Sequence, residues 1–209
     1  MPCLLDKYRL FLVDMDNTLY AERDFVLSGF RAVAGYLAAW GLDSAAAGDY
    51  LQRRFDACGR EKIFNHLLRE FGLEATPERI TELVEVYRGH RPQITLFPGA
   101  EAMLRCMRAR GRVVLVTDGL PAVQERKFKA LGLERLVDQV VYCWATGYPK
   151  PDPRSLEGIV RQGDPEAVLI GDREDHDMEM ARRWGVDGVK VGEGRCLGEC
   201  IALGTLVEQ

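Results

Sequence analysis

The sequence lacks the features that place a protein in or across a membrane. Its longest runs without a charged residue, Ala32–Leu42 and Gln139–Pro149, are too short to cross a bilayer as helices. The apolar run Leu10–Val13 leads directly into Asp14, and no signal peptide is visible before it. We therefore expect a soluble, cytoplasmic protein with no membrane partner.

Positive charge is not in excess either. The chain has 28 Lys and Arg against 32 Asp and Glu, a net charge of −4. This balance excludes a global basic field that would recruit nucleic acid or an anionic lipid surface. We expect no nucleic-acid partner.

Cysteine occurs without the regular spacing of a disulfide framework. In a chain without a visible export signal the six cysteines are expected to be free thiols: Cys3, Cys58, Cys106, Cys143, Cys196 and Cys200. Cys196 and Cys200 would share a helix face and could begin a metal site. No third or fourth ligand lies nearby, which favours ordinary thiols.

Internal repeats and low-complexity linkers are also missing. Of the 209 residues, 47% are hydrophobic and 29% are charged, the composition of a globular protein with a substantial core. This excludes a disordered chain, a collagen-like repeat and a disulfide-stapled miniprotein. The length suits one large domain, or one domain with a sizeable insertion.

Short apolar runs rich in β-branched residues predict five strands. They are nearly continuous rather than alternating, as expected of strands covered on both faces. The five runs are Leu10–Val13, Val113–Val116, Gln139–Tyr142, Val168–Ile170 and Val189–Val191.

Helical patterns separate the later strands. Ala100 begins an i, i+3, i+4, i+7 pattern that Gly111 closes, Pro121 opens a helix running to about Leu131, and a third helix covers Asp177–Trp184. Strands alternating with helices predict an α/β fold with a doubly wound parallel sheet.

One connection, between the first and second strands, is much longer than the others and is helical from Ala21 to Arg91. Its apolar stripes begin at Val26, Phe64 and Ile80, and Thr76 with Pro77 marks the start of the last helix. Stripes of this kind must bury against one another. We expect an inserted helical bundle at residues 21–94 and a catalytic core made of residues 1–20 and 95–209.

Polar residues follow four of the predicted strands, where open α/β sheets bind their ligands. The segments are Asp14-Met15-Asp16-Asn17-Thr18, Thr117-Asp118-Gly119, Lys150 between two prolines, and Gly171-Asp172 with Asp177. Taken singly, these segments can be explained without a function, as turn formers, a surface lysine or acids at the start of a helix. Together, in this order at the strand ends, they indicate a site.

The chemistry that suits this set is phosphoryl transfer. Crowded carboxylates need a cation, and hard oxygen ligands suit Mg²⁺. A carboxylate can attack phosphorus to form an aspartyl-phosphate. A lysine and a hydroxyl can neutralise and orient the phosphate oxygens, and a second carboxylate can act as general acid and base.

These four segments resemble the four motifs of the haloacid dehalogenase-like (HAD) hydrolases, from about Tyr8 to Val191. The helical insertion resembles the alpha-helical cap of the family's first subgroup. The resemblance implies a Rossmann-like core, Mg²⁺ as cofactor and a small phosphorylated metabolite as substrate.

The resemblance also implies roles for individual residues. Asp14 is expected to be the nucleophile and Asp16 the acid and base. The metal is expected to be held by the Asp14 carboxylate, the Asp16 backbone carbonyl and Asp172, with Asp177 acting through water.

The phosphate is expected to be held by Thr117, by Lys150 and by the backbone amides around Asp118 and Gly119. Asp118 departs from the asparagine of many members, which puts a side-chain role for it in doubt. Arg173 and His176 occupy variable positions and receive no role.

Other readings of the same residues stay open. A dehalogenase uses the first aspartate but needs neither a metal nor an acid at position 16. A phosphomutase would differ mainly in its cap contacts. A receiver domain would be about half as long, and a non-catalytic phosphoryl-binding protein would not need every motif intact. We expect a phosphatase.

The insertion says less about specificity. Tyr20, Glu22 and Arg23 follow the first motif and could line the substrate entrance. A basic cluster could contact an anionic substrate or could be a solvated helix face: Arg53, Arg54, Arg60 and Lys62. The identity of the phosphomonoester and the oligomeric state are left open.

Overall fold

The computed structural model describes residues 4–191 and contains one five-stranded sheet. All strands are parallel, in the order β3-β2-β1-β4-β5. The strands are β1 (Leu10–Val13), β2 (Arg112–Thr117), β3 (Gln139–Tyr142), β4 (Ala167–Gly171) and β5 (Asp187–Lys190). The predicted α/β class with a parallel sheet is confirmed.

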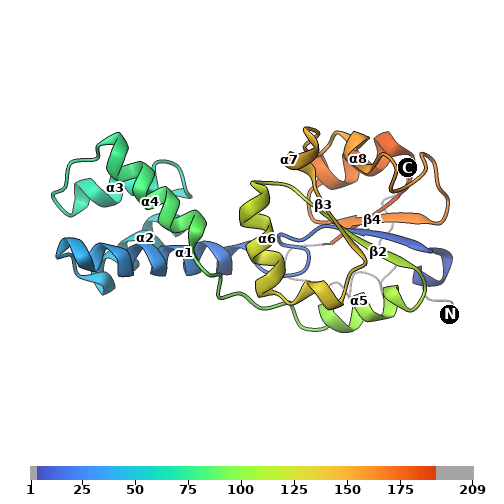
Figure 1. The fold of residues 1–209 in the computed structure, drawn as a ribbon, viewed down its shortest axis with the longest axis horizontal. Helices are drawn as coiled ribbons and strands as arrows, with labels where there is room; N and C mark the ends of the chain where they lie inside the picture. The colour runs from blue at the N-terminus through green and yellow to red at the C-terminus, as the bar shows by residue number, and fades with distance from the viewer. Residues whose placement is uncertain (1–3, 192–209) are drawn as a thin grey trace. The chain divides into compact units, whose positions relative to one another are not determined.

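Helices cover both faces of this sheet, as the continuous apolar strands require. Figure 1 shows α5 (Ala100–Arg108) on one side of the sheet and α8 (Glu179–Trp184) on the other. On the α8 side, Leu12 and Leu169 of the strands pack with Met180 of the helix. The sheet is therefore the central layer of three.

Further elements complete this part of the chain. The α-helices are α6 (Pro121–Ala130) and α7 (Cys143–Thr146), and Glu174–Met178 (η5) is a π-helical turn. Three short 3₁₀ segments complete it: η1 (Leu4–Lys7), η3 (Leu133–Arg135) and η4 (Pro153–Leu156).

Between β1 and β2 lies a separate compact unit, Arg23–Gln93, the helical cap. Its helices are α1 (Glu22–Leu37), α2 (Ser44–Cys58), α3 (Ile63–Glu70) and α4 (Pro77–Gly89), with a 3₁₀ turn η2 (Ala38–Trp40). The Thr76 hydroxyl accepts a hydrogen bond from the backbone N–H of Arg79, so it caps α4 as predicted. The unit has its own core, with Phe30, Leu67 and Leu83 buried in it.

Some predicted boundaries differ from the structure by two residues or more. The helix from Ala100 ends at Arg108, before Gly111. The last strand starts at Asp187, two residues before the predicted Val189. The helix predicted from Asp177 begins as the π-helical turn at Glu174, because the Asp177 carboxylate accepts a hydrogen bond from the backbone N–H of Arg173.

The cysteines within residues 4–191 are free thiols: Cys58, Cys106 and Cys143. The expectations for Cys3, Cys196 and Cys200 lie outside the described residues. In the described part of the chain, no helix combines the length and the apolarity needed to span a membrane.

Candidate active site

The central strands bring the predicted site segments to one edge of the sheet. β1 pairs with β2 on one side and β4 on the other, so Val13 is opposite both Leu115 and Ile170. Asp14 directly follows β1, and Asp172 directly follows β4. Because the strands are parallel, both carboxylates leave the sheet at its carboxyl edge.

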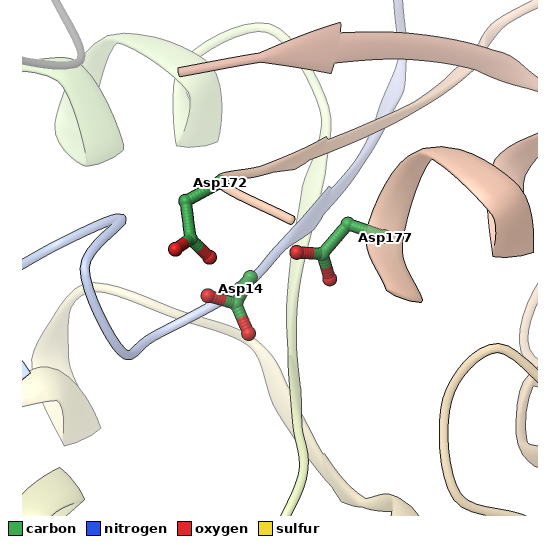
Figure 2. Close-up of side chains that lie close together, drawn as sticks. All are labelled: Asp14, Asp172 and Asp177. Atoms are coloured by element: carbon green, nitrogen blue, oxygen red, sulfur yellow. The ribbon is translucent and has the colours of Figure 1, made fainter. Parts of the chain in front are cut away.

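Three carboxylates meet there. Asp14, Asp172 and Asp177 each offer an oxygen within 4.8 Å of the other two. Figure 2 shows these side chains pointing toward one another from the ends of β1 and β4 and from η5. Burial raises the pKa of Asp14 to about 7, against the opposing effect of Lys150. Burial, with Asp177 nearby, raises the pKa of Asp172 to about 6.

The chemistry of this triad fits a hard divalent cation. Its donors are carboxylate oxygens, and their raised pKa values reflect negative charge that is crowded and poorly solvated. The Asp16 carboxylate is not part of the triad, whereas the Asp177 carboxylate is. A metal held by this edge of the sheet would therefore have three side-chain carboxylates within reach.

Gly171 makes room for Asp177. A Cβ at position 171 would lie 2.3 Å from the Asp177 Cγ, closer than any real contact. Asp177 is 1% exposed and accepts a hydrogen bond from the backbone N–H of Arg173. The glycine before Asp172 is thus needed for the third carboxylate to reach the cluster.

Lys150 connects two of the three carboxylates. Its Nζ lies 2.7 Å from Asp14 Oδ1 and 2.7 Å from Asp177 Oδ1, and its side chain is 2% exposed. Burial acts to lower the pKa of Lys150, but the two carboxylates outweigh it and the pKa is raised. The lysine is therefore charged. It is buried, so the alternative interpretation of Lys150 as a surface lysine is wrong.

Two buried hydroxyls belong to the site segments. Thr18 Oγ1 donates a hydrogen bond of 2.9 Å to Asp14 Oδ2, which fixes the carboxylate at its second oxygen. Thr117, at the end of β2, has a buried Oγ1 without a hydrogen-bond partner among the described residues. An unpaired buried hydroxyl is costly in free energy, and an anion bound at this edge would satisfy it.

The side chain of Asp118, whose role was in doubt because many family members have asparagine there, makes a defined contact. Its Oδ1 accepts a hydrogen bond of 3.1 Å from the backbone N–H of Lys150. The contact ties the loop after β2 to the loop that carries the lysine. Asp118 therefore acts on the position of Lys150 through the backbone.

The Asp16 carboxylate lies with a different group of side chains. Lys127 Nζ is 2.7 Å and 2.9 Å from its two oxygens, Gln124 Nε2 is 3.2 Å from Oδ2, and the Tyr20 hydroxyl donates to Oδ1. Neither Lys127 nor Gln124 was among the residues predicted from the sequence. Their spacing of three within α6, next to the second motif, is the signal that could have found them.

The side chains of the remaining candidates make none of these contacts. Arg173 and His176 both pair with the exposed carboxylate of Asp175. Arg53, Arg60 and Lys62 are exposed on the helical unit, and Arg54 is half-buried. Nothing in the described contacts assigns a catalytic role to any of them.

A family model for haloacid dehalogenase-like hydrolases matches residues 8–185. The match covers β1, β2, β3, β4 and the helical insertion, together with every site segment described above.

Curated relatives include phosphatases. A phosphoserine phosphatase of Thermus thermophilus is 35% identical over 142 residues, which are 65% of this chain and 55% of that protein. A glyceraldehyde 3-phosphate phosphatase of Methanopyrus kandleri is 28% identical over 88% of this chain and 84% of that protein. The alignment to the Thermus protein thus spans about half of that relative's length.

Solved structures share the fold. The HAD-hydrolase YfnB from Bacillus subtilis, bound to magnesium, aligns with a TM-score of 0.63 at 18% identity, over 88% of this chain and 87% of that chain. A 2-haloacid dehalogenase from Pseudomonas syringae aligns with a TM-score of 0.59 at 20% identity, over 88% and 86%. A fold shared at this level does not select a reaction.

Proposed function

This chain belongs to the haloacid dehalogenase-like hydrolase family, and we propose that it is a Mg²⁺-dependent phosphatase of a small phosphomonoester. One observation carries the proposal: a buried carboxylate, Asp14, lies beside a buried ammonium, Lys150, and two further carboxylates. Phosphoryl transfer requires a nucleophile, a cation that binds the phosphate and a site for a metal ion.

In the first step, an Asp14 oxygen attacks phosphorus and the bond from phosphorus to the ester oxygen breaks. The leaving alkoxide takes a proton from Asp16. The product is an aspartyl-phosphate on Asp14 and a free alcohol. Lys150 neutralises charge on the phosphoryl oxygens, and the unpaired Thr117 hydroxyl donates a hydrogen bond to one of them.

In the second step, Asp16 is a carboxylate and accepts a proton from an attacking water. The water oxygen bonds to phosphorus, the bond to Asp14 breaks and inorganic phosphate leaves. Thr18 holds the regenerated Asp14 carboxylate through Oδ2. Asp14, Asp172 and Asp177 would hold Mg²⁺, which when bound draws negative charge away from the phosphoryl oxygens.

The relatives support a phosphomonoester as the substrate class, since they act on phosphoserine and glyceraldehyde 3-phosphate. A dehalogenase is disfavoured, because its reaction needs neither the acid at Asp16 nor a metal at the three carboxylates. A phosphomutase would share the first step, and a non-catalytic binder would share only the binding.

Phosphate release from a panel of phosphorylated metabolites tests the proposal. We expect turnover of small monoesters with Mg²⁺, no turnover in excess EDTA, and little with Ca²⁺, whose looser coordination misplaces the nucleophile. Full activity in EDTA, or no phosphate release from any member of the panel, would overturn it.

A further inference from the structure

Helix α6 buries polar side chains where a helix of this fold normally buries apolar ones. Among its ten residues only Gln124 and Lys127 are buried, at 4% and 3% exposure. A spacing of three places them on one face of the helix. Burying an ammonium costs several kcal/mol unless it is paired, so the placement of Lys127 calls for a partner.

That partner is the Asp16 carboxylate. Lys127 Nζ contacts both of its oxygens, at 2.7 Å and 2.9 Å, and the Lys127 side chain is 4% exposed against 22% for Asp16. Gln124 donates to Oδ2 and Tyr20 to Oδ1. Both carboxylate oxygens thus accept hydrogen bonds, from two residues of α6 and from Tyr20 just after the first motif.

Gln124 also joins this group to the second motif. Its Nε2 donates to the backbone carbonyl of Asp118 as well as to Asp16. Position 119 accommodates it: Gly119 has a φ of 120°, and a Cβ there would lie 2.6 Å from Gln124 Nε2. The amide therefore occupies a space that only glycine leaves open, between the two motifs.

We propose that Lys127, with Gln124 and Tyr20, positions Asp16 for both proton transfers, so that α6 is part of the catalytic apparatus of the proposed phosphatase. The proposal rests on the phosphatase function. All three residues act through Asp16 and touch no reacting atom, so they are positioning residues. A carboxylate that rotates freely would leave the position from which it reaches the leaving oxygen in the first step and the attacking water in the second.

A purely structural ion pair would hold α6 in place and do nothing else. The two roles differ in what they predict for leaving groups. Misplacing Asp16 slows alkyl monoesters at the first step, whereas an aryl phosphate has a good leaving group and keeps that step. The second step needs Asp16 for every substrate.

The test compares Lys127→Met with Lys129→Met in the full chain. Lys129 lies on the same helix but is exposed and paired with Glu125. A small misplacement of a catalytic group costs about 10²-fold, so Lys127→Met is expected to lower kcat on an alkyl monoester by about that factor, with KM unchanged. The probes are phosphoserine and glyceraldehyde 3-phosphate.

With p-nitrophenyl phosphate the same variant should show a burst of p-nitrophenol stoichiometric with enzyme, then slow turnover as the aspartyl-phosphate accumulates. Lys129→Met should behave as wild type. Lys127→Arg, which keeps the charge and the donors, should recover part of the alkyl rate. A Lys127→Met variant without a burst and with wild-type kcat overturns the proposal.

A double substitution keeps the test decisive if Lys127→Met is less stable. In an Asp16→Ala background, adding Lys127→Met should leave the rate of p-nitrophenol release unchanged, because the positioned group is already gone. An equal loss in both backgrounds would show a structural role only. Absence of any wild-type turnover would instead refute the phosphatase function, on which this inference depends.

Discussion

The sheet-containing core and the inserted helical unit differ in the kind of side chain that they bury. Every buried charged side chain of the described chain lies in the core: Asp14, Lys127, Lys150 and Asp177. In Arg23–Gln93 the buried polar residues are only Ser28 and His90, and the interior is aliphatic and aromatic. The ion pair of Arg23 with Asp56 is exposed on both sides.

This difference separates stability from function. Buried ion pairs contribute little net stability against an apolar replacement, and removing one partner costs about 3–5 kcal/mol. The core keeps four such charges at the carboxyl edge of its sheet, where ligands bind. The helical unit has no buried charged side chain, and its interior is held mainly by apolar packing. Substitutions of the buried charges in the core should therefore lower activity most, whereas substitutions in the interior of the helical unit should lower stability most.

The largest expected effect is on activity, from Asp14→Asn. The amide is nearly isosteric but is not a nucleophile, so phosphate release should fall to background in a variant that still unfolds in one cooperative transition. Asp24→Asn, at an exposed position of α1, is the matched control and should keep full activity. A variant of Asp14 with measurable turnover would remove this residue from the proposed nucleophilic role.

Lys150→Met is expected to be the next most severe. It removes the ammonium that contacts Asp14 and Asp177 at 2.7 Å, and loss of one such electrostatic donor costs about 10²–10³ in kcat. Steady-state kinetics with a saturating monoester measure it, with Lys129→Met as the control. Wild-type kinetics would show that Lys150 serves only to compensate the carboxylates.

In the helical unit the effect should appear in stability. Leu67 is fully buried in α3, and Leu→Ala at such a site costs about 2–5 kcal/mol. Chemical denaturation should show this loss for Leu67→Ala and no loss for Glu70→Ala, which is exposed on the same helix. An unchanged midpoint for Leu67→Ala would contradict packing as the source of stability there.

The smallest expected effect is the pH dependence of stabilisation by Mg²⁺. Burial raises the pKa of Asp14 to about 7 and that of Asp172 to about 6, from the usual value of 3.8 for an aspartate. Carboxyls with raised folded-state pKa values contribute stability that is complete below the unfolded value. That stability is lost as the pH rises through about 6 to 7.

Under the proposed function, Mg²⁺ would bind the deprotonated triad and offset this loss. At about 100 times Kd it should add about 2.7 kcal/mol, with a larger gain at pH 8 than at pH 5.5, where protons compete for the same oxygens. Thermal melts at the two pH values, with and without EDTA, measure the gain. Equal gains at both pH values, or a gain that survives in Asp172→Asn, would place the ion elsewhere.

Much of the core could be predicted from the sequence. Continuous apolar runs determined the five strands, and the parallel sheet follows from the helices between them. The residues after Val13 and Ile170 could be placed together because parallel strands in adjacent positions end at one edge. Thr76 was recognisable as a cap because its hydroxyl acts locally.

The positioning group around Asp16 could not be predicted in the same way. Which face of α6 turns inward depends on how the helix packs, and its buried face carries Gln124 and Lys127 instead of an apolar stripe. Hydrophobic periodicity cannot identify a buried helix face that consists of polar residues. The early start of the helix near Asp177 was missed for a related reason, since a side-chain contact to the backbone of Arg173 shapes that turn.

Covalent labelling of Asp14 is the most direct test of the proposed chemistry. The Asp16→Asn variant, incubated with acetyl phosphate and Mg²⁺ and quenched in acid, should carry one phosphoryl group on the peptide that contains Asp14. Mass spectrometry should find that group removed by hydroxylamine and absent from Asp14→Asn. A phosphoryl group on any other residue, or wild-type turnover with no label trapped in Asp16→Asn, would contradict an aspartyl-phosphate at Asp14.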